Sequence, residues 1–239
     1  MSDFKTRVRS LQIEITSRCN LSCVYCPHGA GSMRRFVKDM DAKTWAATMH
    51  WVRAFVERGT QTEINLTGIG EPTLHPAFPD MVLECRLVLG PGKPIIIATN
   101  GVAMTKRIVD LIAPAQPEVH LSLHRPDKAA FALPLLRDAG ILKAATMDPA
   151  VAPNDWAGQV AWIPAAYVFD CCWLRDGKAF VASTGDILAC CIDAGGYTKS
   201  GGNVVTHEPG TVSIGPSSLC RRCYHHVACY GPGFDQTAG

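Results

Sequence analysis

The chain has 239 residues, which at roughly 100 to 200 residues per domain allows one full domain plus a small appendage and excludes two large domains. Apolar residues make up 47% and charged residues 18%, so the chain can bury a core and is not a low-complexity sequence. Its 23 Lys and Arg residues nearly balance 21 Asp and Glu residues, which excludes an evident nucleic-acid partner. Because it has neither a signal peptide nor a long apolar run, we expect a cytoplasmic protein with no membrane partner.

Residues 11 to 164 alternate short β-forming runs with amphipathic stretches, the pattern of βα units around a buried parallel sheet. The clearest helix follows Asp41, a good N-cap, and carries an apolar stripe that begins at Trp45 and a candidate C-cap at Gly59. A second helix places Cys85 in the core. We expect six strands, over residues 11–16, 62–67, 94–99, 118–123, 141–147 and 159–163.

After Ala165 this alternation stops, and the remaining residues are rich in Gly, Ser, Thr and Cys. One β-hairpin is expected, with Lys178–Ser183 paired to Ile187–Cys191 around the turn at 184–186. A segment with so few apolar runs usually needs a metal to fold, and its cysteines supply the ligands. We therefore expect one domain over residues 1–165 and a small cysteine-rich domain over residues 166–239.

Cysteine is the unusual component, with 11 residues in a chain that lacks a secretory signal, so that its thiols are kept reduced. Three lie at positions 19–26, and seven lie between Cys171 and Cys229. Reduced thiols clustered in this way favour metal binding. The pattern therefore predicts two metal sites at opposite ends of the chain.

The first cluster, Cys19-x3-Cys23-x2-Cys26, directly follows the first expected strand. Three thiolates at this spacing can hold three corners of a [4Fe-4S] cluster and leave the fourth iron without a protein ligand. Structural zinc normally takes four ligands, so the zinc alternative needs His28 or a distant residue as the fourth.

With Tyr25 just before its last cysteine, this segment resembles the cysteine motif of the radical S-adenosylmethionine superfamily. Three further segments stand where that family has its cofactor-binding elements: Gly70-Glu71-Pro72 after the second expected strand, Thr99-Asn100 after the third and Ser122 at the end of the fourth. Each follows the C-terminal end of a strand, the functional face of such barrels. Alone, Gly-Glu-Pro indicates only a turn, and Ile69 stands where the family often has Gly.

The resemblance implies an α/β fold, a partial (β/α)6 TIM-like barrel, whose cluster chelates the amine and carboxylate of S-adenosylmethionine. Cleavage of that cofactor by an external electron donor of the flavodoxin or ferredoxin type then gives a 5'-deoxyadenosyl radical, which removes a hydrogen from an unactivated carbon. Glu71 and nearby backbone carbonyls would accept hydrogen bonds from the methionyl ammonium. The cofactor-binding residues that it implies are Tyr25, Gly70, Glu71, Pro72, Thr99, Asn100 and Ser122.

The tail resembles the extension that holds an auxiliary [4Fe-4S] cluster in such enzymes, in the shortened form of a SPASM domain called a twitch domain. The implied ligands are Cys172, Cys190, Cys220 and Cys223. Cys171 or Cys191 could replace its neighbour, and the role of Cys229 stays open. A longer extension would need another cysteine where Gly233 stands. A zinc ribbon with four cysteine ligands is the alternative on spacing alone.

Shortened extensions of this kind resemble those of enzymes that epimerise or oxidise carbinol carbons of aminocyclitols and aminoglycoside sugars. An epimerase needs a hydrogen donor, usually a thiol, whereas a dehydrogenase passes an electron to the auxiliary cluster. Cys191 is the candidate donor, because strand alternation would turn it away from Cys190, and its alternative is a small buried side chain. We therefore expect an epimerase of a small aminosugar or aminocyclitol in antibiotic biosynthesis, with a dehydrogenase as the alternative.

Two further alternatives are weaker. A ribosomal-peptide-modifying enzyme would often carry an extra N-terminal module, whereas the first expected strand here begins at Leu11. A non-enzymatic iron–sulfur or zinc scaffold would make the vacant iron and the Gly70-Glu71-Pro72 segment coincidental.

Overall fold

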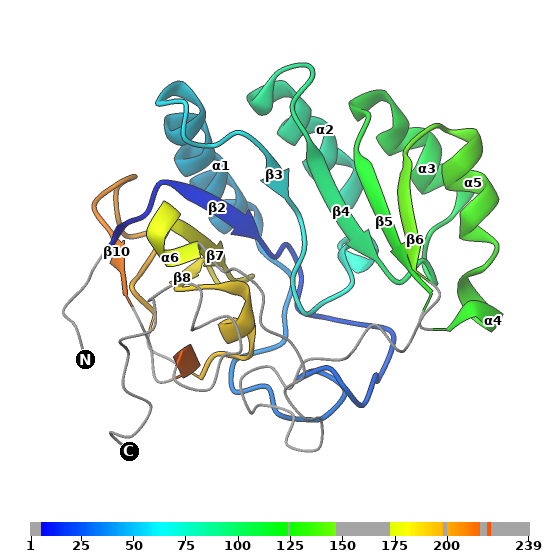
Figure 1. Cartoon of the computed structure of the whole chain (residues 1–239), viewed down its shortest axis with the longest axis horizontal. Helices are drawn as coiled ribbons and strands as arrows, with labels where there is room; N and C mark the ends of the chain where they lie inside the picture. Colours follow the sequence, from blue (N-terminus) through cyan, green and yellow to red (C-terminus); the bar gives the residue numbers. More distant parts are fainter. Residues whose placement is uncertain (1–5, 124, 147–172, 198–199, 216–218, 221–239) are drawn as a thin grey trace.

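The computed structural model describes residues 6–123, 125–146, 173–197, 200–215 and 219–220. Within them, eight strands form one sheet in the order β6-β5-β4-β3-β2-β7-β8-β9, and β1 pairs with β10 (Figure 1). The strands are β1 (Thr6–Arg7), β2 (Ser10–Ile13), β3 (Ile64–Asn65), β4 (Ile95–Thr99), β5 (Glu118–Ser122), β6 (Leu142–Thr146), β7 (Lys178–Val181), β8 (Asp186–Leu188), β9 (Gly202–Asn203) and β10 (Ser213–Ile214). The helices are α1 (Ala42–Glu57), α2 (Phe78–Leu89), α3 (Lys106–Ile112), α4 (Pro126–Ala129), α5 (Ala132–Asp138) and α6 (Trp173–Asp176), with 3-10 turns η1 (Pro72–Leu74), η2 (Ala113–Ala115) and η3 (Cys191–Gly195).

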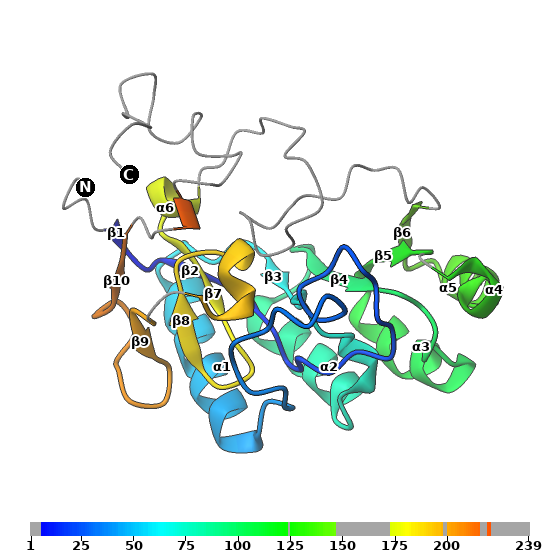
Figure 2. The ribbon, with the colours of Figure 1, turned by 90° about the horizontal axis from the view of Figure 1, so that it is seen from below.

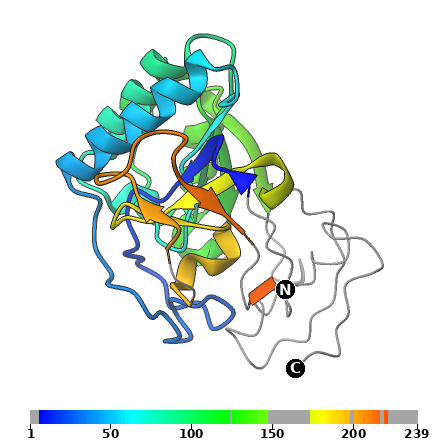
Figure 3. The same ribbon diagram turned by 90° about the vertical axis from the view of Figure 1, so that its left-hand side faces the viewer.

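Strands β2 to β6 are parallel and stand side by side in the order of the sequence. Helices α1, α2, α3 and α5 connect them and cover one face of the sheet (Figures 1 and 3). Sequential order without a reversal, with helices on one face, is the arrangement of a barrel wall and differs from a doubly wound sheet. The expected α/β class is confirmed, and five of the six expected strands occur, while the sixth, at 159–163, lies outside the described residues.

The two faces of this sheet differ because side chains alternate along each strand. Leu11, Ile13 and Ile64 are completely or almost completely buried in the core beneath the helices. The opposite face carries polar side chains, among them Gln12 and Asn65, which are register partners on β2 and β3. This polar face is the inside of the partial barrel.

Helix α1 begins as expected at Asp41, whose carboxylate accepts a hydrogen bond of 2.8 Å from the backbone N–H of Thr44. Its apolar stripe, which begins at Trp45, packs in the core, and the helix ends at Glu57. Gly59 follows with a φ of +70°, the left-handed conformation that suits glycine after a helix end. No helix among the described residues is long and apolar enough to cross a membrane.

The expected hairpin is present, but it ends earlier and belongs to a larger sheet. Strand β8 ends at Leu188, so Cys190 and Cys191 have left the ladder, and Cys191 begins η3. The alternation argument for the direction of Cys191 is therefore wrong. Strand β7 pairs in parallel with β2, so the hairpin continues the sheet of the barrel. The division at residue 165 stays a prediction.

Candidate functional site

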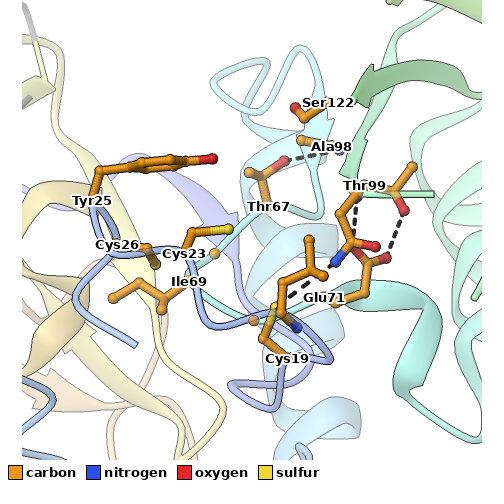
Figure 4. A pocket seen from close by; sticks show the side chains of 14 residues that line it. Cys19, Cys23, Tyr25, Cys26, Thr67, Ile69, Glu71, Ala98, Thr99 and Ser122 are labelled. Carbon is orange, nitrogen blue, oxygen red and sulfur yellow. Dashed lines mark hydrogen bonds between the residues drawn. The ribbon is translucent and has the colours of Figure 1, made fainter. Parts of the chain in front are cut away.

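A pocket of about 190 Å³ opens at the C-terminal ends of the parallel strands (Figure 4). Its walls come from the loop after β2, the segment after β3 and the ends of β4 and β5. The structure brings together in it nine of the residues that the sequence analysis singled out: Cys19, Cys23, Tyr25, Cys26, Gly70, Glu71, Thr99, Asn100 and Ser122. Their roles stay predictions.

Several pocket residues were not assigned a role by the sequence analysis. Thr67 and Ala98 lie on the inner face of the sheet, where the hydroxyl of Thr67 accepts a hydrogen bond of 3.3 Å from the backbone N–H of Ala98. Leu21 and Gly68 complete the wall beside Ile69. Pro72, which the analysis did single out, begins η1 and is buried without lining the pocket.

The three cysteines of the first cluster line the pocket from the loop after β2 (Figure 4). Burial raises the pKa of Cys19 and of Cys26 above the ordinary thiol value, so that both are neutral until a cation binds. Sulfur donors of this kind fit an iron–sulfur cluster held through three thiolates. His28, one of the two options for a fourth zinc ligand, does not line the pocket, and no three His, Cys, Asp or Glu side chains in the described segments could hold one metal ion.

Two glycines let the loop after β2 pack against the rest of the site. A Cβ added at Gly70 would lie 2.0 Å from the backbone oxygen of Thr16, and one added at Gly29 would lie 2.3 Å from the backbone oxygen of Cys23. Both distances are far shorter than any real contact, so only glycine fits. Gly29, three residues after the last cysteine of the motif, was missed because a single Gly has no distinctive pattern.

The carboxylate of Glu71 is turned into the protein, and the residue is 2% exposed. Its Oε1 accepts hydrogen bonds of 2.6 Å from the hydroxyls of Thr73 and Thr99, and its Oε2 accepts one of 2.7 Å from the backbone N–H of Asn100. Burial raises its pKa, while these donors oppose that effect. The main structural effect of the carboxylate is therefore to join the start of η1 to the end of β4.

Asn100 links the end of β4 to the cysteine loop. Its side-chain NH2 group donates a hydrogen bond of 2.8 Å to Oδ1 of Asn20. The same group donates a second hydrogen bond, of 3.8 Å, to the sulfur of Cys19. Its own Oδ1 accepts from the backbone N–H of Val102 at 2.9 Å. N–H groups directed at a cluster ligand stabilise the thiolate, so this amide would help to set the properties of a cluster bound there.

Of the second cysteine cluster, the structure describes Cys190, Cys191 and Cys220, while Cys172 and Cys223 lie outside the described residues. Burial raises the pKa of Cys190, and the neighbouring thiols of Cys191 and Cys220 raise it further. Two of the expected auxiliary-cluster ligands, Cys190 and Cys220, are therefore close in space.

Cys191, the candidate hydrogen donor, is not among the residues that line the pocket. It packs against a small apolar cluster that contains Ile69, Phe180 and Ala194, and Cys26 packs against the same cluster. Ile69 and Cys26 both line the pocket, so this apolar cluster connects η3 to the pocket wall.

The sequence profile of the Radical SAM superfamily matches residues 13–146. A GTP 3',8-cyclase from Chlorobaculum tepidum is 30% identical over 135 residues, which cover 56% of this chain and 38% of that protein. A tungsten-containing aldehyde ferredoxin oxidoreductase cofactor-modifying protein from Pyrococcus furiosus is 36% identical over 108 residues, 44% of this chain and 28% of that protein. The chain thus matches well under half the length of these curated relatives.

Two solved structures resemble most of the described fold. BtrN in complex with AdoMet and 2-DOIA has a TM-score of 0.67 at 21% identity and covers 84% of this chain and 80% of its own. Streptococcus suis SuiB bound to precursor peptide SuiA has a TM-score of 0.62 at 15% identity and covers 84% and 63%. At these identities the likeness is one of fold.

Proposed function

Because the chain belongs to the radical SAM superfamily, we propose that it inverts a CH–OH centre of a small aminosugar or aminocyclitol, as in antibiotic biosynthesis, with Cys191 returning the hydrogen. When bound, a [4Fe-4S] cluster and S-adenosylmethionine supply the 5'-deoxyadenosyl radical that abstracts the carbinol hydrogen. The observation that carries the proposal is the position of Cys191 on the same apolar cluster as Cys26 and Ile69.

The residues of the pocket have distinct tasks in this proposal. Cys19, Cys23 and Cys26 would hold the cluster, and the backbone around Gly70 would meet the methionyl amine. Tyr25, Thr99, Asn100 and Ser122 would complete the cofactor site, while Glu71 and Pro72 shape it. The pocket walls would shield the reacting groups from water.

A second cluster would be held by the tail. The ligands proposed for it are Cys172, Cys190, Cys220 and Cys223, and the proximity of Cys190 to Cys220 supports this set. An external donor of the flavodoxin or ferredoxin type supplies the electrons.

The step assigned to Cys191 balances as a hydrogen-atom transfer. Its S–H bond breaks and a C–H bond forms on the opposite face of the substrate carbon, which leaves a sulfur-centred radical. That sulfur recovers one electron from the external donor and one proton from solvent. A hydrogen-atom donor must carry the S–H bond, and the partly buried Cys191 packs against the apolar cluster.

A dehydrogenase is the alternative, and the same pocket serves it. The carbon radical would then lose its hydroxyl proton and pass one electron to the auxiliary cluster, and the substrate carbon would become a ketone. A peptide-modifying activity is a third candidate. BtrN was crystallised with 2-DOIA and SuiB with a precursor peptide, and each structure covers 84% of this chain, so both substrate classes are included in the assay.

The test uses the full chain, reconstituted anaerobically and reduced, with a panel of aminoglycosides, aminocyclitols and a precursor peptide. We expect 5'-deoxyadenosine and an epimer whose mass is unchanged in ordinary water and one deuterium heavier in deuterated water. Loss of two hydrogens would identify the dehydrogenase. Failure to cleave S-adenosylmethionine, or zinc in place of iron, would contradict the proposal as a whole.

The role of Cys191 is tested by Cys191→Ala, which should still abstract hydrogen but release oxidised product in place of the epimer. Cys85→Ala is the control, because Cys85 is 0% exposed in α2 and its loss affects only packing. Epimer formation with solvent deuterium by Cys191→Ala would exclude this thiol as the donor.

A further inference from the structure

The end of the cysteine loop is docked on η3, the segment that carries Cys191. The backbone N–H of Arg34 donates to the carbonyl oxygen of Gly195 at 2.9 Å, and the hydroxyl of Tyr197 donates to the carbonyl oxygen of Ser32 at 2.6 Å. The guanidinium of Arg34 lies 4.1 Å from the centre of the Tyr197 ring. Figures 2 and 3 show the loop after β2, in blue, beside η3, in gold. The two cysteine-bearing segments are thus fixed to each other.

A buried ion pair lies behind this docking surface. Arg35 Nη2 is 2.6 Å from the carboxylate of Glu14, and the side chains are only 10% and 1% exposed. Arg35 Nε also donates to the carbonyl oxygen of Ala194, three residues after Cys191. One guanidinium therefore holds η3 and Glu14 together.

Glu14 connects this pair to the pocket wall. It follows β2, and its Oε1 accepts a hydrogen bond of 3.0 Å from the backbone N–H of Ile69. A Cβ added at Gly68 would lie 2.4 Å from the Glu14 side chain, so the wall and the carboxylate are in direct contact. The backbone N–H of Ser183, in the turn of the β7–β8 hairpin, is 3.4 Å from Oε2.

A buried ion pair is weak evidence of a stabilising role, because well-packed apolar residues often stabilise a core as much. Its value lies in geometry, since a planar guanidinium and a carboxylate fix both direction and distance. Here the pair joins three parts of the chain: η3, the pocket wall at Gly68 and Ile69, and the turn of the β7–β8 hairpin.

We propose that Glu14 and Arg35 are positioning residues that fix η3, and with it Cys190 and Cys191, against the pocket wall at Gly68 and Ile69. The expected effect of this positioning on hydrogen return from Cys191 rests on the proposed function. The geometric part does not depend on the reaction.

The geometric part is tested by hydrogen exchange on the reconstituted full chain. Arg35→Met and Glu14→Gln should speed exchange of the Gly196 and Tyr197 amides at least about tenfold, the effect of about 1.4 kcal/mol of local opening. Amides of α2 around Cys85 should not change. Arg125→Met is the matched control, because Arg125 forms an exposed ion pair of 2.6 Å with Asp127, outside both η3 and α2. The proposal would be overturned if Arg35→Met and Glu14→Gln left amide exchange in η3 unchanged. It would also be overturned if these two variants accelerated exchange equally in η3 and α2.

The functional part is tested by the ratio of 5'-deoxyadenosine to product. Arg35→Met should raise this ratio several-fold and shift product from epimer toward ketone, while Arg35→Lys, which keeps the charge, should restore part of the coupling. A lower rate with an unchanged ratio would show that the pair serves stability alone. If no substrate is found, the exchange result still decides the geometric part, so the two failures are distinguishable.

Discussion

Glu71 illustrates how a single side chain organises the pocket. A carboxylate with 2% exposure is unfavourable unless donors compensate for lost water, and here Thr73, Thr99 and the backbone of Asn100 supply them. Because these donors come from η1 and from the end of β4, the charge fixes two walls of the pocket relative to each other.

Glu71→Gln places an amide NH2 group where a donor now approaches. We expect the free energy of unfolding to fall by about 1–3 kcal/mol, the cost of unpaired buried polar groups. S-adenosylmethionine binding should weaken with it, measured by equilibrium dialysis on the reconstituted protein. Glu63→Gln is the control, because Glu63 forms an ion pair with Lys178 in which the two side chains are 33% and 28% exposed. Loss of this solvent-screened pair should cost less than about 1 kcal/mol. Equal losses for the two variants would contradict this account.

Gly70→Ala tests the close approach between the two loops. Its Cβ would meet the Thr16 backbone oxygen at 2.0 Å, so the backbone must shift, and overpacking of this kind costs about 1–3 kcal/mol. We expect a lower Tm together with weaker cofactor binding. Gly92→Ala is the control: Gly92, unlike Gly70, has a positive φ, of +73°, but nothing lies within 4 Å of its added Cβ. It should lower Tm without affecting cofactor binding, and similar binding losses in both variants would refute the steric explanation.

At this scale, the sequence allowed prediction of residues in short motifs. Cys19, Glu71 and Asn100 each sit in a local pattern that follows a strand. Glu14 and Arg35 escaped prediction because their partners are distant along the chain, including Ser183 and Ala194, and nothing near them indicates a buried pair.

Among the helices and strands, the start of α1 is the one most directly explained by the local sequence. Its N-cap, Asp41, accepts from the backbone N–H of Thr44, and this bond, with help from Lys38, lowers the pKa of Asp41 from 3.8 to about 2. A carboxyl whose pKa is lower in the folded state contributes stability above its unfolded pKa and loses it as the pH falls.

Two substitutions separate the hydrogen bond of this cap from its charge. Asp41→Ala should lower the free energy of unfolding by about 1 kcal/mol near neutral pH. Asp41→Asn keeps a good cap but does not titrate, so its small deficit relative to the native chain should vanish as the pH falls from about 5 to about 2. Urea unfolding across that range measures both. A deficit that grows with falling pH would reverse the assigned sign.

Elements were predictable where a local rule governs them and less so where distant contacts do. Strand β4 and the start of α1 follow from residue type and capping alone. The end of β8 does not, because Ala189 to Cys191 continue an apolar run, and it is the docking of η3 on residues 32–35 that favours a 3-10 turn there.

In the whole molecule, the tail completes the sheet of the barrel. Leu11 and Ile13 on β2 pair with Ala179 and Val181 on β7, and all four side chains are at most 1% exposed. The indole N–H of Trp51 donates to the carbonyl oxygen of His207 at 3.1 Å, so the tail also covers α1. Parallel pairing between such distant segments leaves no mark in the local sequence, which is why the hairpin was expected to stand apart.

This continuity makes a prediction about the division at residue 165. A fragment of residues 1–165 would leave β2 as an exposed edge strand and uncover the apolar side chains that β7 and the tail bury, so we expect it to aggregate or to unfold without cooperativity. Size-exclusion chromatography and urea unfolding measure this. The control is the full chain with Cys190→Ser and Cys220→Ser, which removes two proposed ligands but keeps β7. That control should keep the elution volume of the native full chain and unfold cooperatively, since the sheet needs the strand and not the metal. A soluble, cooperative fragment with a Tm near that of the full chain would instead show that the first 165 residues fold without the tail.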